Sequence, residues 1–462
     1  MLSPRRAYST KSFIGLVVLA AIIGVTAIFA SRAAGGCNVT LNSGANISQA
    51  ANSVASGGTV CLNPGTYQWN GGSWATVDKQ SMTTITPAPG VSKSVVSIEW
   101  AQLALSNNVR FDGVTIGGVE LGNDSTPSKN IQIINSTFTG TSLVRTPTNE
   151  KINVLFEGNT FANLDVGGGY EGRLTVRGYN NISTNGIIIK GNTFGPNGCS
   201  DGVQIIGDAY GTEISDNDFN NVKQGSCSAH VDSIQLYGSN YTRITGNYFH
   251  NGDSYIMAPD GGDHEYMANN VFVYGGYVPA VQMGSHNAST FTHNTVIGIT
   301  VSMSRKQERA DNSVNGVITN NVFTGSNSGL SYTVTGGANG CTNCKNDRNY
   351  GSGGTNPVTG TIVYSGGTTP TTFTGYSLAQ NSAGKGAAFN SQGQPDGTDI
   401  GINYTSVPSN PSADLNGDGI VDGVDLSILL SGYGGSEAGD INGSGLVDIF
   451  DLSILLSNYG IN

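Results

Sequence analysis

Two segments of the chain repeat one order of side chains that suits acid–base chemistry. Asp201-Gly-Val-Gln204 and Asp232-Ser-Ile-Gln235 each open with a carboxylate and carry an amide three residues later, and His230 stands two residues before the second carboxylate. Carboxylates can act as general acid or base, and a histidine beside one of them can accept a proton near neutral pH. Together these residues predict a catalytic site on two neighbouring strands.

Lyase cleavage of a polymer that contains uronic acid is one reaction that fits. A lyase needs a base for the proton next to the uronate carboxylate, and calcium or arginine to neutralise that carboxylate. His230 is the first choice for the base, followed by Lys223 and Arg173. We favour this reaction.

Hydrolysis by paired aspartates is the alternative. Neighbouring strands lie about 4.8 Å apart, so Asp201 and Asp232 are expected within roughly 6 Å of each other, which suits a retaining enzyme. The wider gap from Asp201 to Asp253 suits an inverting enzyme, and the register at Asp253 is ambiguous in the sequence. A purely structural interpretation also stays open, because an aspartate at the start of a strand often only caps a turn.

Side chains that alternate along these strands predict one outward face of polar residues, whose types suit a glycan. When the two segments are aligned, Val203 and Ile234 are expected to point inward, so that their neighbours point outward. Amides and arginines can bind hydroxyls and carboxylates, and a tyrosine can stack on a sugar ring. The expected glycan-binding side chains are Arg173, Arg177, Gln204, Gln235, Tyr237 and Lys223. A non-catalytic surface adhesin or glycan-binding protein would use the same face.

One sequence pattern recurs between residues 130 and 325: a β-branched strand, a polar residue, Asn, any residue, and then an aromatic residue. The last residue of the pattern returns every 23 to 33 residues. Repeats of this length, built from short strands and Asn or Gly corners, indicate a solenoid whose Asn side chains bond along a ladder and whose Phe side chains fill the interior. The Asn residues of the pattern are Asn135, Asn159, Asn192, Asn217, Asn247, Asn270, Asn294 and Asn321.

The repeats resemble the right-handed parallel β-helix of the pectate-lyase superfamily. The resemblance covers residues 37–404, with a short helix at 47–54 able to cap the open end and a first coil at 58–67. Residues 384–388 and 399–401 are similar to the closing segment of such domains. The resemblance implies an all-β fold, a groove on the first sheet that binds an extended polysaccharide, and a calcium ion as a candidate for that groove.

The N-terminus and the cysteines predict a protein that is secreted or held at the cell surface. Residues 1–34 read as a signal peptide, and the uncharged run at residues 13–30 is also long enough to be a membrane anchor. Six cysteines can all pair in an oxidising compartment. Their order suggests the pairs Cys37–Cys61, Cys199–Cys227 and Cys341–Cys344.

Two near-copies of one calcium loop occupy the C-terminal fifty residues. Each copy supplies oxygen ligands in the pattern of a 12-residue calcium loop, with Gly at its sixth position and a backbone carbonyl at its seventh. Both copies continue with the run Leu-Ser-Ile-Leu-Leu-Ser, which indicates a duplication with one helix after each loop. The expected ligands are Asp414, Asn416, Asp418, Ile420, Asp422 and Asp425 in the first loop, and Asp440, Asn442, Ser444, Leu446, Asp448 and Asp451 in the second.

This duplicate resembles a type I dockerin, a small calcium module that attaches secreted enzymes to cohesin receptors. The resemblance covers residues 414–460 and implies a dockerin-like domain at 414–462, joined by a linker at 405–413. It also implies two bound calcium ions and a cohesin-like receptor as partner. Ser444 is a weaker neutral ligand than the aspartate at the same position of the first loop.

The acidity of the chain comes mostly from this module. The net charge is −11, and the residues from Thr405 onward contain eight acidic side chains and no Lys or Arg, so the rest of the chain carries −3. The charge therefore reports calcium ligands and not a preference for cationic partners. The absence of a basic patch in the sequence argues against nucleic acid as a partner.

Overall fold

The structure is a computed structural model that describes residues 36–165, 170–228, 230–274, 281–304, 312–326, 328–331, 340–390, 393–403, 415 and 421–435, with residues 439, 441, 447, 451–452, 455–456 and 459 beyond them. The chain divides into two compact units, residues 1–357 and 358–462. The predicted signal peptide or anchor and the predicted linker lie outside the described residues. No helix of the described residues is long and apolar enough to cross a membrane.

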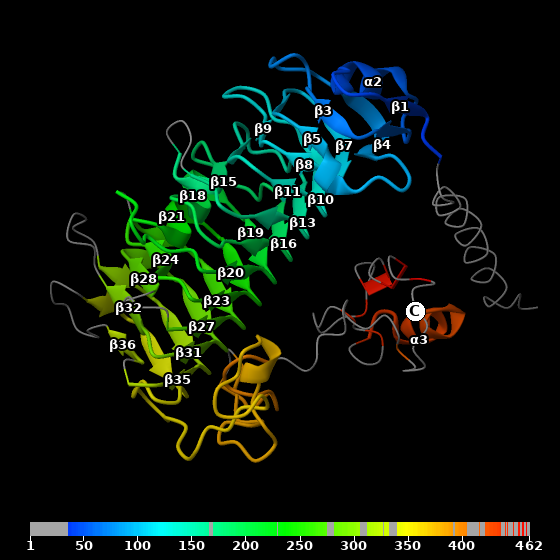
Figure 1. Cartoon of the computed structure of the whole chain (residues 1–462). Coiled ribbons are helices and arrows are strands. Elements are labelled where there is room, and N and C mark those ends of the chain that lie inside the picture. The colour runs from blue at the N-terminus through cyan, green and yellow to red at the C-terminus, as the bar shows by residue number, and fades with distance from the viewer. Residues whose placement is uncertain are drawn as a thin grey trace, which may run out of the picture. The chain divides into compact units, whose positions relative to one another are not determined.

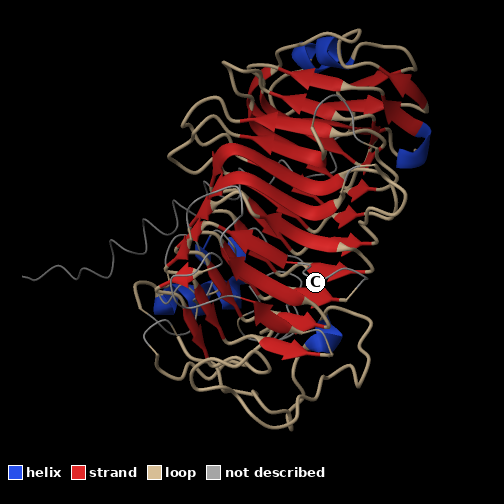
Figure 2. Ribbon diagram, turned by 90° about the vertical axis from the view of Figure 1, so that its left-hand side faces the viewer, coloured by secondary structure: helices blue, strands red, loops and turns tan. Residues whose placement is uncertain are grey.

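The described strands of the first unit pair in parallel and form three sheets of 13, 11 and 14 strands. Each coil adds one strand to each sheet in turn, and Figure 1 shows the coils stacked from β1 towards β36. Figure 2 shows the strands of successive coils as parallel rungs. This architecture confirms the predicted all-β solenoid and agrees with a parallel β-helix.

Short strands separated by corners make up each sheet. The 13-stranded sheet contains β1 (Val39–Leu41), β2 (Thr59–Leu62), β4 (Asp78–Pro87), β7 (Asn107–Asp112), β10 (Lys129–Ile134), β13 (Val154–Glu157), β16 (Ile187–Lys190), β19 (Glu213–Ser215), β22 (Arg243–Thr245), β26 (Tyr266–Ala268), β30 (Thr290–Thr292), β34 (Val317–Thr319) and β38 (Lys345–Asp347). The 11-stranded sheet contains β3 (Gly65–Tyr67), β5 (Val96–Ile98), β8 (Thr115–Ile116), β11 (Thr137–Phe138), β14 (Thr160–Phe161), β17 (Thr193–Phe194), β20 (Asp218–Asn220), β23 (Tyr248–His250), β27 (Val271–Val273), β31 (Thr295–Ile297) and β35 (Val322–Thr324).

The 14-stranded sheet carries the candidate site. Its main path contains β6 (Ala101–Leu103), β9 (Val119–Leu121), β12 (Ser142–Arg145), β15 (Gly172–Arg177), β18 (Asp201–Tyr210), β21 (Asp232–Asn240), β24 (Ser254–Ala258), β28 (Val281–Gly284), β32 (Thr300–Ser304) and β36 (Gly329–Ser331). Four further strands pair beside this path: β25 (Gly262–Asp263), β29 (His286–Asn287), β33 (Ser313–Val314) and β37 (Cys341–Thr342).

A ladder of buried asparagines fixes the corner between the 13- and 11-stranded sheets. The side-chain amide of Asn217 donates to Oδ1 of Asn247 and to the carbonyl of Ile189, both at 2.9 Å, and the same pattern repeats along the stack. The ladder contains Asn159, Asn192, Asn217, Asn247, Asn270, Asn294, Asn321 and Asn349. The predicted ladder is therefore confirmed, except that Ser136 takes the place expected for Asn135.

Stacked phenylalanines fill the interior, as predicted. Phe161, Phe194 and Phe219 are fully buried, and neighbouring ring centroids lie 4.8 Å apart with nearly parallel planes. Each offset aromatic pair adds about 0.5–1.5 kcal/mol beyond the burial of apolar area. The column makes the interior dry and rigid, so that side chains on the outer face have a firm support.

The ends and loops of the first unit are also tied down. Helix α2 (Ile47–Ser53) buries Ile47 and Ala51 next to the first coils (Figure 1) and confirms the predicted helical cap, and the 3₁₀ turn η2 (Lys93–Val95) precedes β5. The structure forms the three expected disulfides, Cys37–Cys61, Cys199–Cys227 and Cys341–Cys344. Disulfides are typical of proteins outside the reducing cytosol.

The second unit contains the 3₁₀ turn η3 (Thr374–Tyr376) and the helix α3 (Gly423–Gly432) among its described residues. Asp422 caps α3 by accepting from the N–H of Val424 at 2.8 Å, and Oδ2 of Asp425 accepts from the N–H of Asp422. A small buried cluster combines apolar side chains from both sequence copies: Val421, Leu429, Val447 and Leu455.

Candidate functional site

Asp201 and Asp232 are neighbours across one coil step, as their sequence alignment predicts. The backbone N–H of Asp232 donates to Oδ1 of Asp201 at 2.8 Å. The register supports this placement, because Val203 pairs with Ile234 on the same two strands. The Cys199–Cys227 disulfide joins the loops that lead into β18 and β21, with a Cα–Cα distance of 5.5 Å. The two carboxylates are therefore held by the sheet and by a covalent link.

Burial makes these two carboxyl groups unusual acids. Asp201 is 1% and Asp232 0% exposed, and Oδ2 of Asp201 has no hydrogen-bond partner among the described residues. Burial, followed by the charge of Asp232, raises the pKa of Asp201 to about 8. Burial also raises the pKa of Asp232, against the lowering effects of the Ser254 hydroxyl and of His230. At neutral pH the pair therefore favours one negative charge over two.

His230 connects the buried Asp232 to solvent. Its Nδ1 lies 3.0 Å from Oδ2 of Asp232, and its side chain is 57% exposed while that of Asp232 is fully buried. If Nδ1 carries the proton that Asp232 accepts, Nε2 is the free basic nitrogen. The sequence placed these two residues together, and the structure gives them the geometry of a base oriented by a carboxylate.

The outer row of β15, β18 and β21 consists of polar side chains that bind one another. Gln204 donates through Nε2 to Oε1 of Gln235, and its Oε1 accepts from the Glu171 N–H at 3.1 Å and from the Thr175 hydroxyl at 3.3 Å. Gln204 and Gln235 are only 6% and 9% exposed. Their outward direction agrees with the prediction, but their first role is to order the row.

Tyr237 is the accessible aromatic side chain of this strand pair. It is 59% exposed, and its Cα pairs with that of Ile206 on the neighbouring strand. The alternation rule predicted this outward direction. The ring of Tyr237 is therefore free of the close packing that covers Gln204 and Gln235.

Arg173 does not face the groove, and the prediction that it points outward is wrong. It is fully buried, and its guanidinium donates to the carbonyls of Phe161 at 2.8 Å and Asn197 at 2.6 Å. Burial lowers its pKa to about 10. The alternation breaks after it: Gly172 faces outward, because a Cβ there would lie 2.8 Å from the Thr175 hydroxyl, whereas Arg173 and Leu174 are both buried. Arg173 ties two corners together from within.

Two further predicted site residues lie elsewhere. Ser254, not Asp253, pairs with Asp232, so Asp253 is not the next member of the aspartate column. The carboxylate of Asp253 instead accepts from the backbone N–H of Gln224 at 3.2 Å. Lys223 lines an open hollow of about 630 Å³ together with Asn251 and Tyr274, among others, just after strands of the 11-stranded sheet.

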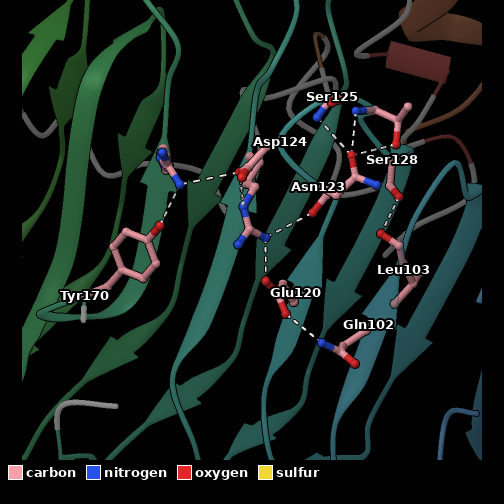
Figure 3. A network of polar contacts seen from close by, with 12 residues as sticks. Gln102, Leu103, Glu120, Asn123, Asp124, Ser125, Ser128 and Tyr170 are labelled. Carbon is pink, nitrogen blue, oxygen red and sulfur yellow. Dashed lines mark hydrogen bonds and ion pairs between the residues drawn. The ribbon is translucent and has the colours of Figure 1, made fainter. Parts of the chain in front are cut away.

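Three residues that the sequence did not single out contribute to this face. Glu171 raises the pKa of both Asp201 and Asp232 through its charge, and Ser254 lowers that of Asp232. Asp124 forms an ion pair with Arg177, whose side chain is 34% exposed (Figure 3). Glu171 stands directly before β15, one residue ahead of Gly172, which pairs with Asp201, so it adjoins the aspartate column without belonging to it.

Most of the predicted calcium ligands lie outside the described residues: Asp414, Asn416, Asp418, Ile420, Asp440, Asn442, Ser444, Leu446 and Asp448. Of the three that are described, Asp425 and Asp451 are fully buried. Oδ1 of Asp425 accepts from the N–H of Leu415 at 2.7 Å. In the described part of the chain, no group of three or more His, Cys, Asp or Glu side chains is placed to hold a metal ion.

Comparisons with known proteins give similar folds and no family. No protein-family model matches the chain, and no curated protein matches it. Among solved structures, it is similar to a point mutant of the PL6 family alginate lyase AlyGC, with TM-score 0.44 and 11% identity over 80% of this chain and 60% of that one. The chain thus spans less than two thirds of the length of that structure.

Two other solved structures are similar to the chain. A mannuronic acid specific polysaccharide family 6 lyase from human gut microbiota has TM-score 0.43 and 13% identity, over 68% of this chain and 80% of that one. Pectate lyase Pel9A has TM-score 0.34 and 16% identity, over 81% of this chain and 97% of that one. These neighbours are polysaccharide lyases, and similarities of this size do not identify the reaction of this chain.

Proposed function

We propose that the first unit cleaves a polysaccharide containing uronic acid by β-elimination, on the outer face of the 14-stranded sheet. The observation that carries the proposal is the pair of His230 and Asp232, with Nδ1 3.0 Å from Oδ2. An exposed imidazole fixed by a buried carboxylate is suited to take a proton and to carry the resulting charge. The exposed ring of Tyr237 and the outward Arg177 lie on the same sheet.

The reaction follows from the position of this base. Nε2 of His230 removes the proton from C5 of a uronate, the electron pair forms the C4–C5 double bond, and the bond from C4 to the leaving oxygen breaks. The leaving oxygen takes a proton, for which the imidazolium just formed is a source. Asp232 stabilises this imidazolium. Because the pKa of Asp201 is raised to about 8, Asp201 stays protonated at neutral pH and leaves Asp232 as the charged member of the pair.

The described residues of this groove do not fit a calcium ion. Glu171, Asp201 and Asp232 interact electrostatically, but the described acidic and histidine side chains form no group of three that could hold a metal ion.

Hydrolysis is the second candidate, and one observation favours it. A carboxyl group whose pKa is about 8 is protonated at neutral pH, as a general acid must be. The test is a panel of polyuronates and neutral glycans, with ultraviolet absorbance for the unsaturated product and reducing ends for any cleavage. Absorbance with new ends supports the lyase, and ends without absorbance support the hydrolase. No cleavage in the panel would favour a glycan-binding protein or adhesin.

The C-terminal duplicate is proposed to dock the enzyme to a cohesin-like receptor in a calcium-dependent way, outside the cell. Support comes from the two matching loop sequences and from the buried Asp425 and Asp451 at the last position of each loop. Hard cations such as calcium take carboxylate and carbonyl oxygens, which both loops supply. Calcium titration of the full chain tests this part, with two bound ions as the expected result.

A further inference from the structure

Two arginines lie side by side on the outer face of the 14-stranded sheet, one and two coils before Asp201. The Cα of Arg145 on β12 pairs with that of Arg177 on β15. Their side chains are 13% and 34% exposed. The row beside them contains Thr175 and Gln204, so the arginines belong to the same face as the candidate site.

Both arginines and one phenol converge on a single carboxylate oxygen. Oδ1 of Asp124 lies 3.2 Å from Nε of Arg145 and 3.5 Å from a terminal nitrogen of Arg177, and it accepts a hydrogen bond from the Tyr179 hydroxyl. The guanidinium of Arg177 also stacks over the Tyr179 ring, 4.7 Å from its centroid. Figure 3 shows Asp124 within this network of polar contacts, and Tyr170 at its edge. Two guanidinium groups and one hydroxyl that meet at one point can bind a carboxylate.

Asp124 is the outermost and most accessible member of this cluster. Its side chain is 68% exposed, against 13% for Arg145. The Tyr179 hydrogen bond, then the two arginines, lower the pKa of Asp124, so it is ionised at neutral pH. Exposed ion pairs contribute little to stability, so another carboxylate can compete for this position.

The loop that carries Asp124 does not depend on the Asp124 side chain. Oδ1 of Asn123 accepts from the N–H groups of Ser125 at 2.9 Å and Thr126 at 2.8 Å, which fixes the turn (Figure 3). Arg145 also donates to the carbonyl of Gly122 at 3.1 Å. A change at Asp124 therefore removes a charge from the cluster and leaves the loop in place.

The charges of the cluster select for an acidic partner. Arg145 already pairs with Glu120 at 2.5 Å, and Oε2 of Glu120 accepts from Gln102 at 2.8 Å. Two arginines are thus balanced by Glu120 and Asp124. A ligand carboxylate that replaces Asp124 preserves this balance, whereas a neutral sugar leaves one guanidinium without a counter-charge.

We propose that Arg145, Arg177 and Tyr179 form a binding site for the carboxylate of one acidic sugar residue, which Asp124 occupies until the glycan displaces it. The two arginines lie two and three coil steps from Asp232 along the stack, so the site holds a part of the glycan away from the bond that is cleaved. The inference rests on the proposed function. It requires that the substrate carries an acidic sugar residue at a distance from the cleaved bond.

The test measures binding by calorimetry with the full chain, in a His230→Ala background so that the ligand is not consumed. The ligands are hexamers of galacturonate, mannuronate and guluronate, with cellohexaose as the neutral control. Asp124→Asn is expected to bind an acidic hexamer roughly tenfold more tightly than the parent, and cellohexaose unchanged. Adding Arg177→Gln to Asp124→Asn is expected to abolish the gain.

Glu150→Gln is the matched control, because it removes the same charge from an exposed ion pair with Lys129. An equal gain in this variant, an equal gain for cellohexaose, or no gain for any acidic hexamer with Asp124→Asn would overturn the inference. The proposed function is judged separately by unsaturated product from the wild-type chain. A lyase that releases product and shows no gain with Asp124→Asn contradicts the carboxylate site alone.

Discussion

The backbone N–H of Asp232 donates to the carboxylate of Asp201 across one coil step, at 2.8 Å, and both side chains are buried. Burial and the neighbouring charge raise the pKa of Asp201 from its ordinary value of 3.8 to about 8. The folded state therefore holds a proton that the unfolded chain releases. Its stability must fall as the pH rises through this window.

Asp201→Asn tests this linkage, because the amide keeps an oxygen acceptor for the Asp232 N–H and cannot ionise. We expect the melting temperature of the wild type to fall between roughly pH 4 and roughly pH 8, and that of the variant to fall less. Glu150→Gln, an exposed change, is expected to follow the wild type. Parallel pH profiles for Asp201→Asn and the wild type would show that Asp201 ionises normally.

Arg173 is expected to matter for stability and not for substrate affinity. Replacing it with Met leaves the carbonyls of Phe161 and Asn197 without their buried donor, at a cost of about 2–4 kcal/mol in the free energy of unfolding. Arg243→Met, which removes an exposed guanidinium stacked over Tyr266, is expected to cost less than about 1 kcal/mol. Denaturant unfolding measures both. If Arg173→Met has normal stability and a raised KM, Arg173 binds substrate in the groove after all.

The asparagine ladder is expected to be a main source of stability. Asn217→Ala removes the bonds to Ile189 and Asn247 inside the stack, and we expect a loss of about 2–4 kcal/mol. Asn42→Ala, which removes one exposed hydrogen bond from Asn63, is expected to change stability by less than about 0.5 kcal/mol. Thermal unfolding of both variants is the measurement. If both variants melt at the same temperature, the asparagine ladder does not stabilise the fold.

The fold and part of the site could be predicted because strand periodicity and coil length repeat. Aligning Asp201 with Asp232 gave the correct register, the outward direction of Tyr237 and the disulfide between Cys199 and Cys227. The alternation rule failed at Arg173. This residue lies inside β15, but it is buried like its neighbour Leu174, and its guanidinium donates to the carbonyl of Phe161.

Two other predictions were wrong by one residue, and one cluster was missed because its members lie far apart in the sequence. Asn135 was expected in the ladder, but Ser136 stands at that position, two residues before the buried Phe138. Asp253 was expected in the aspartate column, where Ser254 pairs with Asp232. Asp124 could not be predicted, because its partners Arg145 and Tyr179 are far away in the sequence and meet it only when the coils stack.

Calcium is expected to bind the C-terminal duplicate through both loops. In the full chain, calorimetric titration should give two sites, and Asp425→Asn or Asp451→Asn should each remove one of them. Oδ1 and Oδ2 of Asp425 also accept from backbone N–H groups of Leu415 and Asp422, so this carboxylate is already oriented at the start of α3. A stoichiometry that does not change in either variant would contradict the predicted ligands.

The exposed base beside Asp232 is the central element of the proposed reaction. His230→Ala should reduce kcat by about 10²–10⁴-fold, because general base catalysis contributes a factor of this size. His264→Ala is the matched control: its ring is also exposed and also pairs with an aspartate, Asp263, at 2.9 Å. It should retain wild-type activity, and its melting temperature should fall slightly, because the ring stacks on Tyr241 and alanine is strained at the left-handed backbone of this position.

The most direct measurement is the ultraviolet absorbance of unsaturated uronate released from a polyuronate panel by the wild type, His230→Ala and His264→Ala. We predict that absorbance rises with the wild type and with His264→Ala on at least one acidic polymer, and that it stays near the blank with a folded His230→Ala. Equal product from His230→Ala, or cleavage by the wild type without absorbance, would contradict a lyase that uses His230 as its base.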